Sequence, residues 1–329
     1  MKHLFATTVT AAVIGASGAF AQDCGTVQLA EMNWASAGVM TYIDKIILEE
    51  GYGCEVELVT GDTVPTFTSM AEKSEPDMAP ELWINAFRVA LDAAVAEGNL
   101  IYGGEVLNEG GVEGWWIPTS LAEEYGITTV AQALEHPELF SGAEDSSKGA
   151  FFGCPAGWAC QIINSNLYKA YGLDAAGFEL VDPGSAAGLD GSIARAFERG
   201  EGWFGYYWAP TSILGKYDMT LLDFGVEHDA EEWANCTVDI DCADPQPNAW
   251  VKSEVYTVVT DDFAEKAGVA MDYVKARTWD NRTAGMVLAW MTDNQGSNED
   301  GAYYFLENFG DVWGAWVSDD VATKVKDAL

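Results

Sequence analysis

Apolar and polar residues alternate along the chain in a pattern typical of strands followed by amphipathic helices. Short apolar runs at 26–32, 54–60 and 255–260 predict strands. Longer segments with helical spacing, such as 37–50 and 64–73, predict helices. Repeated alternation of strand and helix favours an α/β fold with open sheets flanked by helices.

Further elements follow from the same patterns. Strands are expected at 77–82, 150–152, 203–208 and 220–224, and helices at 87–97, 121–139 with loops, 161–171, 192–199, 262–276, 280–293, 302–310 and most of 312–329. Ser36 precedes the first predicted helix and is expected to cap it, and Gly51 ends that helix.

The composition of the chain changes near residue 110, and this change predicts a crossing between two domains. Glycines at 110, 111 and 114 form a flexible stretch, and a chain of about 300 residues exceeds the size at which one core usually stops growing. We therefore expect residues 22–114 and 226–329 to form lobe 1 and residues 115–225 to form lobe 2. A chain that leaves one lobe and returns to it forms a hinged pair that can close on a ligand.

The first 21 residues have the features of an export signal. A basic start at Lys2 precedes an apolar run over residues 4–18, and Ala19-Phe20-Ala21 is an A-x-A cleavage pattern. We expect the mature chain to begin at Gln22, to be exported, and to be periplasmic.

Six cysteines in an exported chain predict three disulfides. Two pairs each enclose a short loop, and the remaining two cysteines would form the third bridge. The expected pairs are Cys154–Cys160, Cys236–Cys242 and Cys24–Cys54. A metal site is the alternative, but the spacings are not C-x2-C, and only His136 and His228 remain after cleavage.

Charge and motifs exclude several classes of function. The formal net charge is −36, from 16 basic and 52 acidic residues, and so negative a surface repels nucleic acid and anionic lipid. Adaptation to salty surroundings is the favoured explanation of this charge, and attraction of a cationic ligand is the alternative. The sequence contains no G-x-S-x-G, H-E-x-x-H or phosphate-binding loop, so we expect neither an enzyme nor a bound cofactor.

Four of the 13 tryptophans follow or end predicted strands. They are Trp34, Trp83, Trp158 and Trp208. Ligands of open α/β sheets bind at the carboxyl ends of strands, so these indoles are expected to converge on one cleft. Indole faces attract methylated ammonium groups through the ring quadrupole. The alternative for any tryptophan is core packing, which we expect for Trp203, Trp233, Trp250, Trp279, Trp290, Trp313 and Trp316.

Several segments resemble the periplasmic glycine betaine/proline betaine-binding proteins of ABC transporters. The segment C-P-A-G-W-A-C at 154–160 is similar to that family's C-N-P-G-W-G-C disulfide loop, and F-G-Y-Y-W-A-P at 204–210 is similar to its F-Y-Y-T-W-T-P segment. The segment E-L-W-I-N at 81–85 resembles V-N-W-T-P, and the helix at 124–132 is also similar. The resemblance extends from about residue 60 to 275.

The resemblance implies a fold, a ligand class and a partner. It implies a two-lobed periplasmic binding protein, type II-like, with Trp83, Trp158 and Trp208 as three walls of an aromatic cage. The implied ligand is a small methylated ammonium compound such as glycine betaine, and the implied partner is the membrane permease of an ABC importer. We expect a monomer.

Departures from the family pattern leave the ligand open within its class. Trp34, Trp115 and Trp116 add aromatic candidates, and the Cys24–Cys54 and Cys236–Cys242 pairs are additional. Trimethylamine N-oxide, choline, carnitine and dimethylsulfoniopropionate share the methylated head. A carboxylate at Glu113 would repel the carboxylate of betaine, and it could accept a hydrogen bond from a protonated N-oxide or from the choline hydroxyl. A solvated hinge charge is the alternative for Glu113.

Two further alternatives remain. A sugar-binding importer component also uses indoles, although sugar sites need many polar groups beside the rings, and the segments around Trp158 and Trp208 are apolar. Asp239, Asp241 and Asp244 alternate in a loop that could bind calcium, but the 12-residue calcium-loop pattern with its terminal Glu is absent. A solvated acidic loop is the other interpretation.

Overall fold

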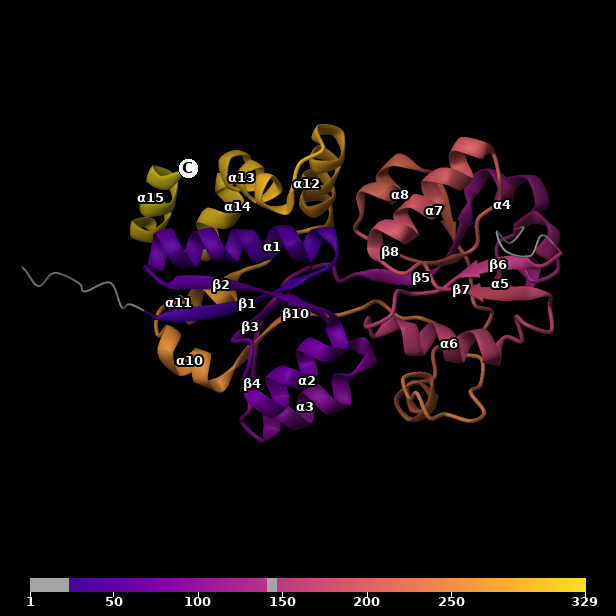
Figure 1. Cartoon of the computed structure of the whole chain (residues 1–329), viewed down its shortest axis with the longest axis horizontal. Coiled ribbons are helices and arrows are strands. Elements are labelled where there is room, and N and C mark those ends of the chain that lie inside the picture. Colours follow the sequence, from indigo (N-terminus) through magenta and orange to yellow (C-terminus); the bar gives the residue numbers. More distant parts are fainter. Residues whose placement is uncertain (1–23, 141–146) are drawn as a thin grey trace, which may run out of the picture.

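The chain folds into two open sheets, each flanked by helices, which lie side by side along the long axis of the molecule (Figure 1). The computed structural model describes residues 24–140 and 147–329. The signal peptide predicted for residues 1–21 lies outside the described residues. Two sheets with helices on both faces confirm the predicted α/β, two-lobed fold class.

The first sheet has the strand order β2-β1-β3-β10-β4. Its strands are β1 (Thr26–Met32), β2 (Glu55–Gly61), β3 (Met78–Trp83), β4 (Leu100–Glu105) and β10 (Val255–Thr260). β1 pairs with β2 and β3 in parallel, whereas β10 runs antiparallel to both β3 and β4.

The second sheet repeats this plan with the order β7-β6-β8-β5-β9. Its strands are β5 (Val112–Pro118), β6 (Gly149–Phe152), β7 (Phe178–Val181), β8 (Gly205–Ala209) and β9 (Met219–Leu221). β6 pairs with β7 and β8 in parallel, and β5 runs antiparallel to β8 and β9.

The antiparallel strand of each sheet follows a crossing from the other sheet. Sheet membership places the first crossing between Glu105 and Val112 and the second between Leu221 and Val255. The boundary expected after residue 114 therefore falls within β5, and the one expected after residue 225 falls within the second crossing.

Helices cover both sheets. Around the first sheet are α1 (Ala35–Ile46) with its extension η1 (Ile47–Tyr52), α2 (Thr63–Lys73), η2 (Ile84–Ala86), α3 (Arg88–Ala96), α10 (Asp261–Ala267), α11 (Ala270–Ala276), α12 (Asn281–Asn294), α13 (Asn298–Asn308), α14 (Gly310–Trp313), η5 (Gly314–Trp316) and α15 (Asp319–Ala328). Around the second are α4 (Thr119–Tyr125), α5 (Val130–Ala133), η3 (Pro137–Phe140), α6 (Cys160–Ala170), α7 (Ala186–Arg199) and α8 (Ser212–Lys216). No described helix is long and apolar enough to span a bilayer.

The second crossing is not a bare linker. It contains α9 (Ala230–Glu232) and η4 (Trp233–Thr237), and its loop passes beneath α6 (Figure 1). The buried Asn166 amide of α6 donates to the backbone carbonyls of Cys236 and Asp239 at 3.1 Å and 2.8 Å. The crossing is thereby fixed to the second lobe.

The structure departs from the predicted elements at several places. The helix expected at 262–276 is two helices, α10 and α11, because Gly268 adopts a positive φ between them. Strands β4, β5 and β7 were not predicted, and α7 begins at Ala186, six residues before the predicted start. Trp34, not Ser36, precedes α1, and Ser36 lies within the first turn with its hydroxyl directed to Glu81.

The structure forms the three predicted disulfides, Cys24–Cys54, Cys154–Cys160 and Cys236–Cys242. The first joins the start of β1 to the start of β2, and the second closes the loop between β6 and α6. The third closes a loop of the second crossing. The described part of the chain has no free cysteine.

Candidate ligand-binding site

A cavity between the two sheets collects aromatic side chains from both lobes. Its empty volume is about 310 Å³ including its open mouth. Its lining residues are Trp34, Thr63, Trp83, Glu113, Trp158, Ala159, Cys160, Tyr206 and Trp208. The four tryptophans expected at strand ends therefore meet in one place.

Each lobe supplies two of the four indoles. Trp34 lies between β1 and α1, and Trp83 is the last residue of β3. Trp158 lies in the disulfide-closed loop between β6 and α6, and Trp208 is the next-to-last residue of β8. β1, β3, β6 and β8 are parallel strands of their sheets, and their carboxyl ends open on the same cleft.

The rings meet edge to face. The ring centroids of Trp158 and Trp34 are 5.2 Å apart at an interplanar angle of 72°, and those of Trp158 and Trp208 are 5.1 Å apart at 80°. Trp158 is therefore the central ring of the group and contacts indoles from both lobes. We call Trp34, Trp83, Trp158 and Trp208 the tryptophan cage.

Three cage indoles use their N–H groups within the protein. Trp34 Nε1 and Trp83 Nε1 donate to Glu81 Oε1 at 2.7 Å and 3.0 Å. Trp158 Nε1 donates to Asn33 Oδ1 at 2.6 Å. Because their polar edges are satisfied by the protein, these indoles offer a ligand their ring atoms. Such a surface suits a group that attracts π electrons and donates no strong hydrogen bond.

Contacts around Trp158 join the two lobes. The Val64 N–H at the start of α2 donates to the Gly157 carbonyl at 3.2 Å. Asn33, which accepts from Trp158, donates its amide to Asp62. Burial raises the pKa of Asp62, and hydrogen bonds from Asn33 and Trp158 lower it in part. The closed arrangement of the lobes is thus stabilised beside the cage itself.

Glu113 is the one acidic residue among the described residues that line the cavity. Its carboxylate accepts hydrogen bonds from the Tyr206 hydroxyl at 2.7 Å and from the Ser253 hydroxyl. In the sheet it lies opposite Trp208, across the β5–β8 pair. It is buried, so it is not the solvated hinge charge that we gave as the alternative.

Burial raises the pKa of Glu113 to about 7, and hydrogen bonds from Ser253 and Tyr206 oppose this rise. The folded protein therefore retains a proton at pH values where the unfolded chain has lost it. The resulting contribution to stability is complete below an ordinary glutamate pKa and is lost as the pH rises through about 7.

Trp115 and Trp116 were expected in the ligand-binding set, and the structure does not bring them to the cavity. Trp115 is fully buried among Phe151, Phe204 and Phe224 in the core of the second lobe. Trp116 projects from the opposite face of β5, and its N–H donates to the Tyr207 carbonyl at 3.0 Å. β5 runs antiparallel to β8, so the start of β5 faces the cleft and Trp115 lies deeper in the lobe.

Three residues of the site were not predicted from the sequence. Tyr206 and Thr63 line the cavity, and Glu81 accepts hydrogen bonds from two cage indoles. Tyr206 is two residues before Trp208 on β8, so the two side chains share a face, and their rings stack at 6.3 Å. The spacing of two residues between Tyr206 and Trp208 on a predicted strand was the indication that the sequence offered for Tyr206. Thr63 begins α2 after a loop, and nothing in the sequence pattern distinguishes Glu81 from the many other acidic residues.

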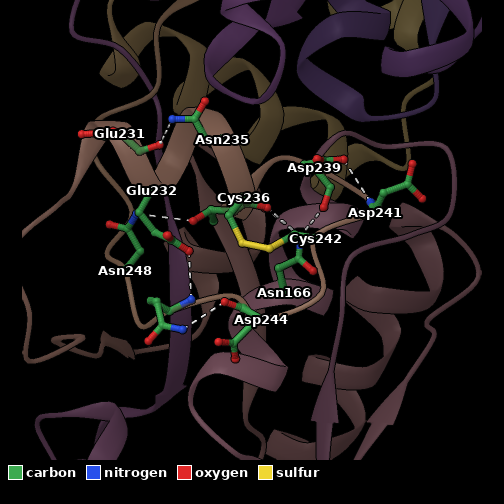
Figure 2. Close-up of a disulfide and its surroundings, with 12 residues drawn as sticks. Asn166, Glu231, Glu232, Asn235, Cys236, Asp239, Asp241, Cys242, Asp244 and Asn248 are labelled. Atoms are coloured by element: carbon green, nitrogen blue, oxygen red, sulfur yellow. Dashed lines mark hydrogen bonds between the residues drawn. A yellow bond between two sulfur atoms is a disulfide. The ribbon is translucent and has the colours of Figure 1, made fainter.

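The acidic loop near the third disulfide does not gather its carboxylates. Asp239 accepts a hydrogen bond from the Asp241 backbone N–H at 3.0 Å, and the Asp244 side chain lies apart from both (Figure 2). Among the described residues, no group of three or more His, Cys, Asp or Glu side chains could hold a metal ion. Local hydrogen bonds explain the conformation of this loop.

Two comparisons of the sequence found similar proteins. The sequence profile described as the substrate binding domain of ABC-type glycine betaine transport system matches residues 25–308. The glycine betaine/proline betaine-binding periplasmic protein of Salmonella typhimurium is 30% identical over 120 residues, which is 36% of this chain and 35% of that protein. This match thus spans about a third of the length of the curated relative.

Solved structures share the fold at low sequence identity. The glycine betaine/L-proline-binding protein ProX of Borrelia burgdorferi has a TM-score of 0.71 at 18% identity, with 91% of this chain and 99% of that one covered. An ABC-transporter choline binding protein in complex with choline has a TM-score of 0.70 at 18% identity, covering 93% and 98%. Lactococcal OpuAC complexed with glycine betaine has a TM-score of 0.67 at 14% identity, covering 89% and 100%.

Proposed function

This chain belongs to the family of substrate-binding domains of ABC-type glycine betaine transport systems, and from that premise we propose that its tryptophan cage captures a small methylated onium compound. The observation that carries the proposal is the convergence of four indoles, two from each lobe, on one cavity. A quaternary ammonium is large and weakly hydrated, and ring faces attract it by about 2 kcal/mol or more per desolvated contact.

The same premise supplies the cellular setting that we propose. The chain is exported, works in the periplasm as a monomer, and delivers its ligand to the membrane permease of an ABC importer. The similarity of this chain to a periplasmic binding protein supports this setting. The excess of 36 negative charges over positive ones disfavours nucleic acid as a partner. No catalytic step is proposed, since the family binds and delivers its substrates.

Glycine betaine, choline and trimethylamine N-oxide are each expected to raise the melting temperature of the ligand-free protein, and glucose and maltose are not. A ligand that binds only the folded state stabilises it by about 2.7 kcal/mol when present at 100 times its dissociation constant. Differential scanning fluorimetry over a concentration series measures this directly. A rise with the sugars and none with the onium compounds would favour the sugar-binding alternative.

Glu113 is proposed to distinguish ligands within the onium class by the charge of their tails. Below about pH 7 it is largely neutral and above it is largely ionised. An ionised Glu113 attracts a cation and accepts from the choline hydroxyl, whereas it repels the carboxylate of betaine. An N-oxide oxygen pairs with a carboxyl through one shared proton, which is retained more readily at low pH.

Between pH 6 and 8 we therefore expect the affinity for choline to rise about three- to tenfold, and that for betaine and the N-oxide to fall by a similar factor. Isothermal titration calorimetry across this range measures the three slopes. Glu113→Gln retains the size of the side chain and removes its titration, so all three slopes should flatten. Unchanged slopes in Glu113→Gln would show that another group is responsible.

A further inference from the structure

We propose that Glu81, which does not line the cavity, gives the tryptophan cage its preference for cations by fixing two indoles and placing a negative charge behind them. This inference rests on the proposed onium-binding function and adds to it a positioning residue outside the ligand contacts.

Glu81 Oε1 accepts three hydrogen bonds. The donors are Trp34 Nε1 at 2.7 Å, Trp83 Nε1 at 3.0 Å and Ser36 Oγ at 2.8 Å. Trp34 and Ser36 belong to the start of α1, whereas Trp83 ends β3. A single oxygen therefore sets the orientation of both indoles that the first lobe contributes to the cage.

The donors favour the ionised form of Glu81. Burial raises its pKa, and hydrogen bonds from Trp34, Trp83 and Ser36, with the charge of Arg277, lower it. Three donors on one oxygen stabilise the carboxylate more than the neutral carboxyl, because hydrogen bonds to an ionised acceptor are the stronger ones. Glu81 is 0% exposed, so water screens this charge poorly.

The negative charge of Glu81 is not compensated by an ion pair. Arg277, the cation that influences it, forms its ion pair with Asp44 at 2.8 Å. Among the described residues, Glu81 forms no ion pair of its own, and its Oε2 atom is buried without a hydrogen-bond partner. A buried charge without an ion pair lowers the stability of the ligand-free protein. A cation bound in the cage would act as its counter-charge across the indoles.

The hydrogen bonds from Trp34 and Trp83 to Glu81 also change the electron distribution of the two indole rings. A carboxylate that accepts from an indole N–H polarises the indole and increases the electron density of its π system. The attraction between a ring and a cation depends on the negative potential of the ring face. Glu81 should therefore strengthen the contacts of Trp34 and Trp83 with a cationic head and leave their contacts with an uncharged head nearly unchanged.

This difference separates an electrostatic role from a purely structural one. Replacement of the onium nitrogen by carbon gives an uncharged head of the same shape. The matched pairs are choline with 3,3-dimethylbutan-1-ol and glycine betaine with 3,3-dimethylbutanoate. Glu81→Gln keeps an oxygen that can accept from the two indoles and removes the charge. Asp190→Asn is the control, because Asp190 lies outside the cavity lining, accepts from Tyr207 at 2.6 Å, and loses the same unit of charge.

Calorimetry on the full mature chain should show that Glu81→Gln lowers the affinity for each onium compound about tenfold or more, and for its carbon isostere by less than about threefold. Asp190→Asn should leave the ratio of the two affinities unchanged. Equal losses for both members of a pair, or no loss, would overturn the inference while the proposed function stands. Failure of the wild-type protein to bind any onium compound would instead overturn the proposed function and this inference with it.

A measurement on the wild-type protein covers the case in which Glu81→Gln does not fold. The indole N–H resonances of Trp34 and Trp83, assigned by Trp34→Phe and Trp83→Phe, should lie downfield and exchange slowly in the ligand-free protein, because both donate to a buried carboxylate. Exchange as fast as that of an exposed indole would overturn the inference.

Discussion

Glycine should bind at least about 100-fold more weakly than N,N,N-trimethylglycine, with N-methylglycine and N,N-dimethylglycine between them. Each methyl group placed against the cage removes apolar surface from water, worth about 0.8 kcal/mol, or roughly a fourfold gain in affinity. The three groups together account for about 2.4 kcal/mol. The primary ammonium must also give up strong hydration and finds ring atoms instead of acceptors, which adds further loss.

Calorimetric titration of this series at one pH and ionic strength tests the expectation. The carboxylate tail is common to all four compounds, so differences between them report on the head alone. Tetramethylammonium, which has a methylated head and no tail, should retain measurable binding. Equal affinity for glycine and trimethylglycine would show that the cage is not the recognition element.

The sequence was sufficient for the fold class, the disulfides and the convergence of the cage. Trp34, Trp83, Trp158 and Trp208 follow or end strands that were recognisable by their apolar runs. Because the carboxyl ends of parallel strands open on the same side of a sheet, their convergence followed from local pattern and topology together. That they bind a ligand stays a prediction.

Trp115 was a candidate only because it adds an aromatic residue to the family pattern, and no strand was predicted at 112–118. The rule that ligands meet the carboxyl ends of strands applies to parallel strands, and β5 is antiparallel to β8. Its starting residues therefore face the cleft, which is why Glu113 reaches the cavity and Trp115 does not. Strand direction depends on how the chain crosses between lobes, and no local pattern records it.

Glu81 shows a second limit of sequence reasoning. Its importance comes from donors separated from it by 45 and 47 residues, Ser36 and Trp34, as well as from its neighbour Trp83. In a chain with 52 acidic residues, one that is fully buried cannot be distinguished from solvated ones by composition. Ser36 was likewise interpreted as a helix cap, since a local role is the default for serine before a helix.

Trp158→Ala should reduce affinity for the preferred onium ligand by about 1–3 kcal/mol, or roughly 5- to 150-fold. Of the four cage rings, Trp158 contacts indoles from both lobes, and its N–H bonds to Asn33 across the cleft. Its removal therefore deletes one ring contact and loosens two others. We expect a larger loss than for Trp83→Ala, for which no contact between cage rings is lost.

Two variants separate ring recognition from closure of the lobes and from packing. Asn33→Ala removes the acceptor of the Trp158 N–H and keeps the ring, so it should weaken binding less than Trp158→Ala. Trp203→Phe alters an indole of the same lobe that is buried against Phe152 and bonded to Ser192, so it should lower the melting temperature without changing affinity. If Asn33→Ala equals Trp158→Ala in effect, the cross-lobe hydrogen bond, and not the ring face, provides the binding energy at this position.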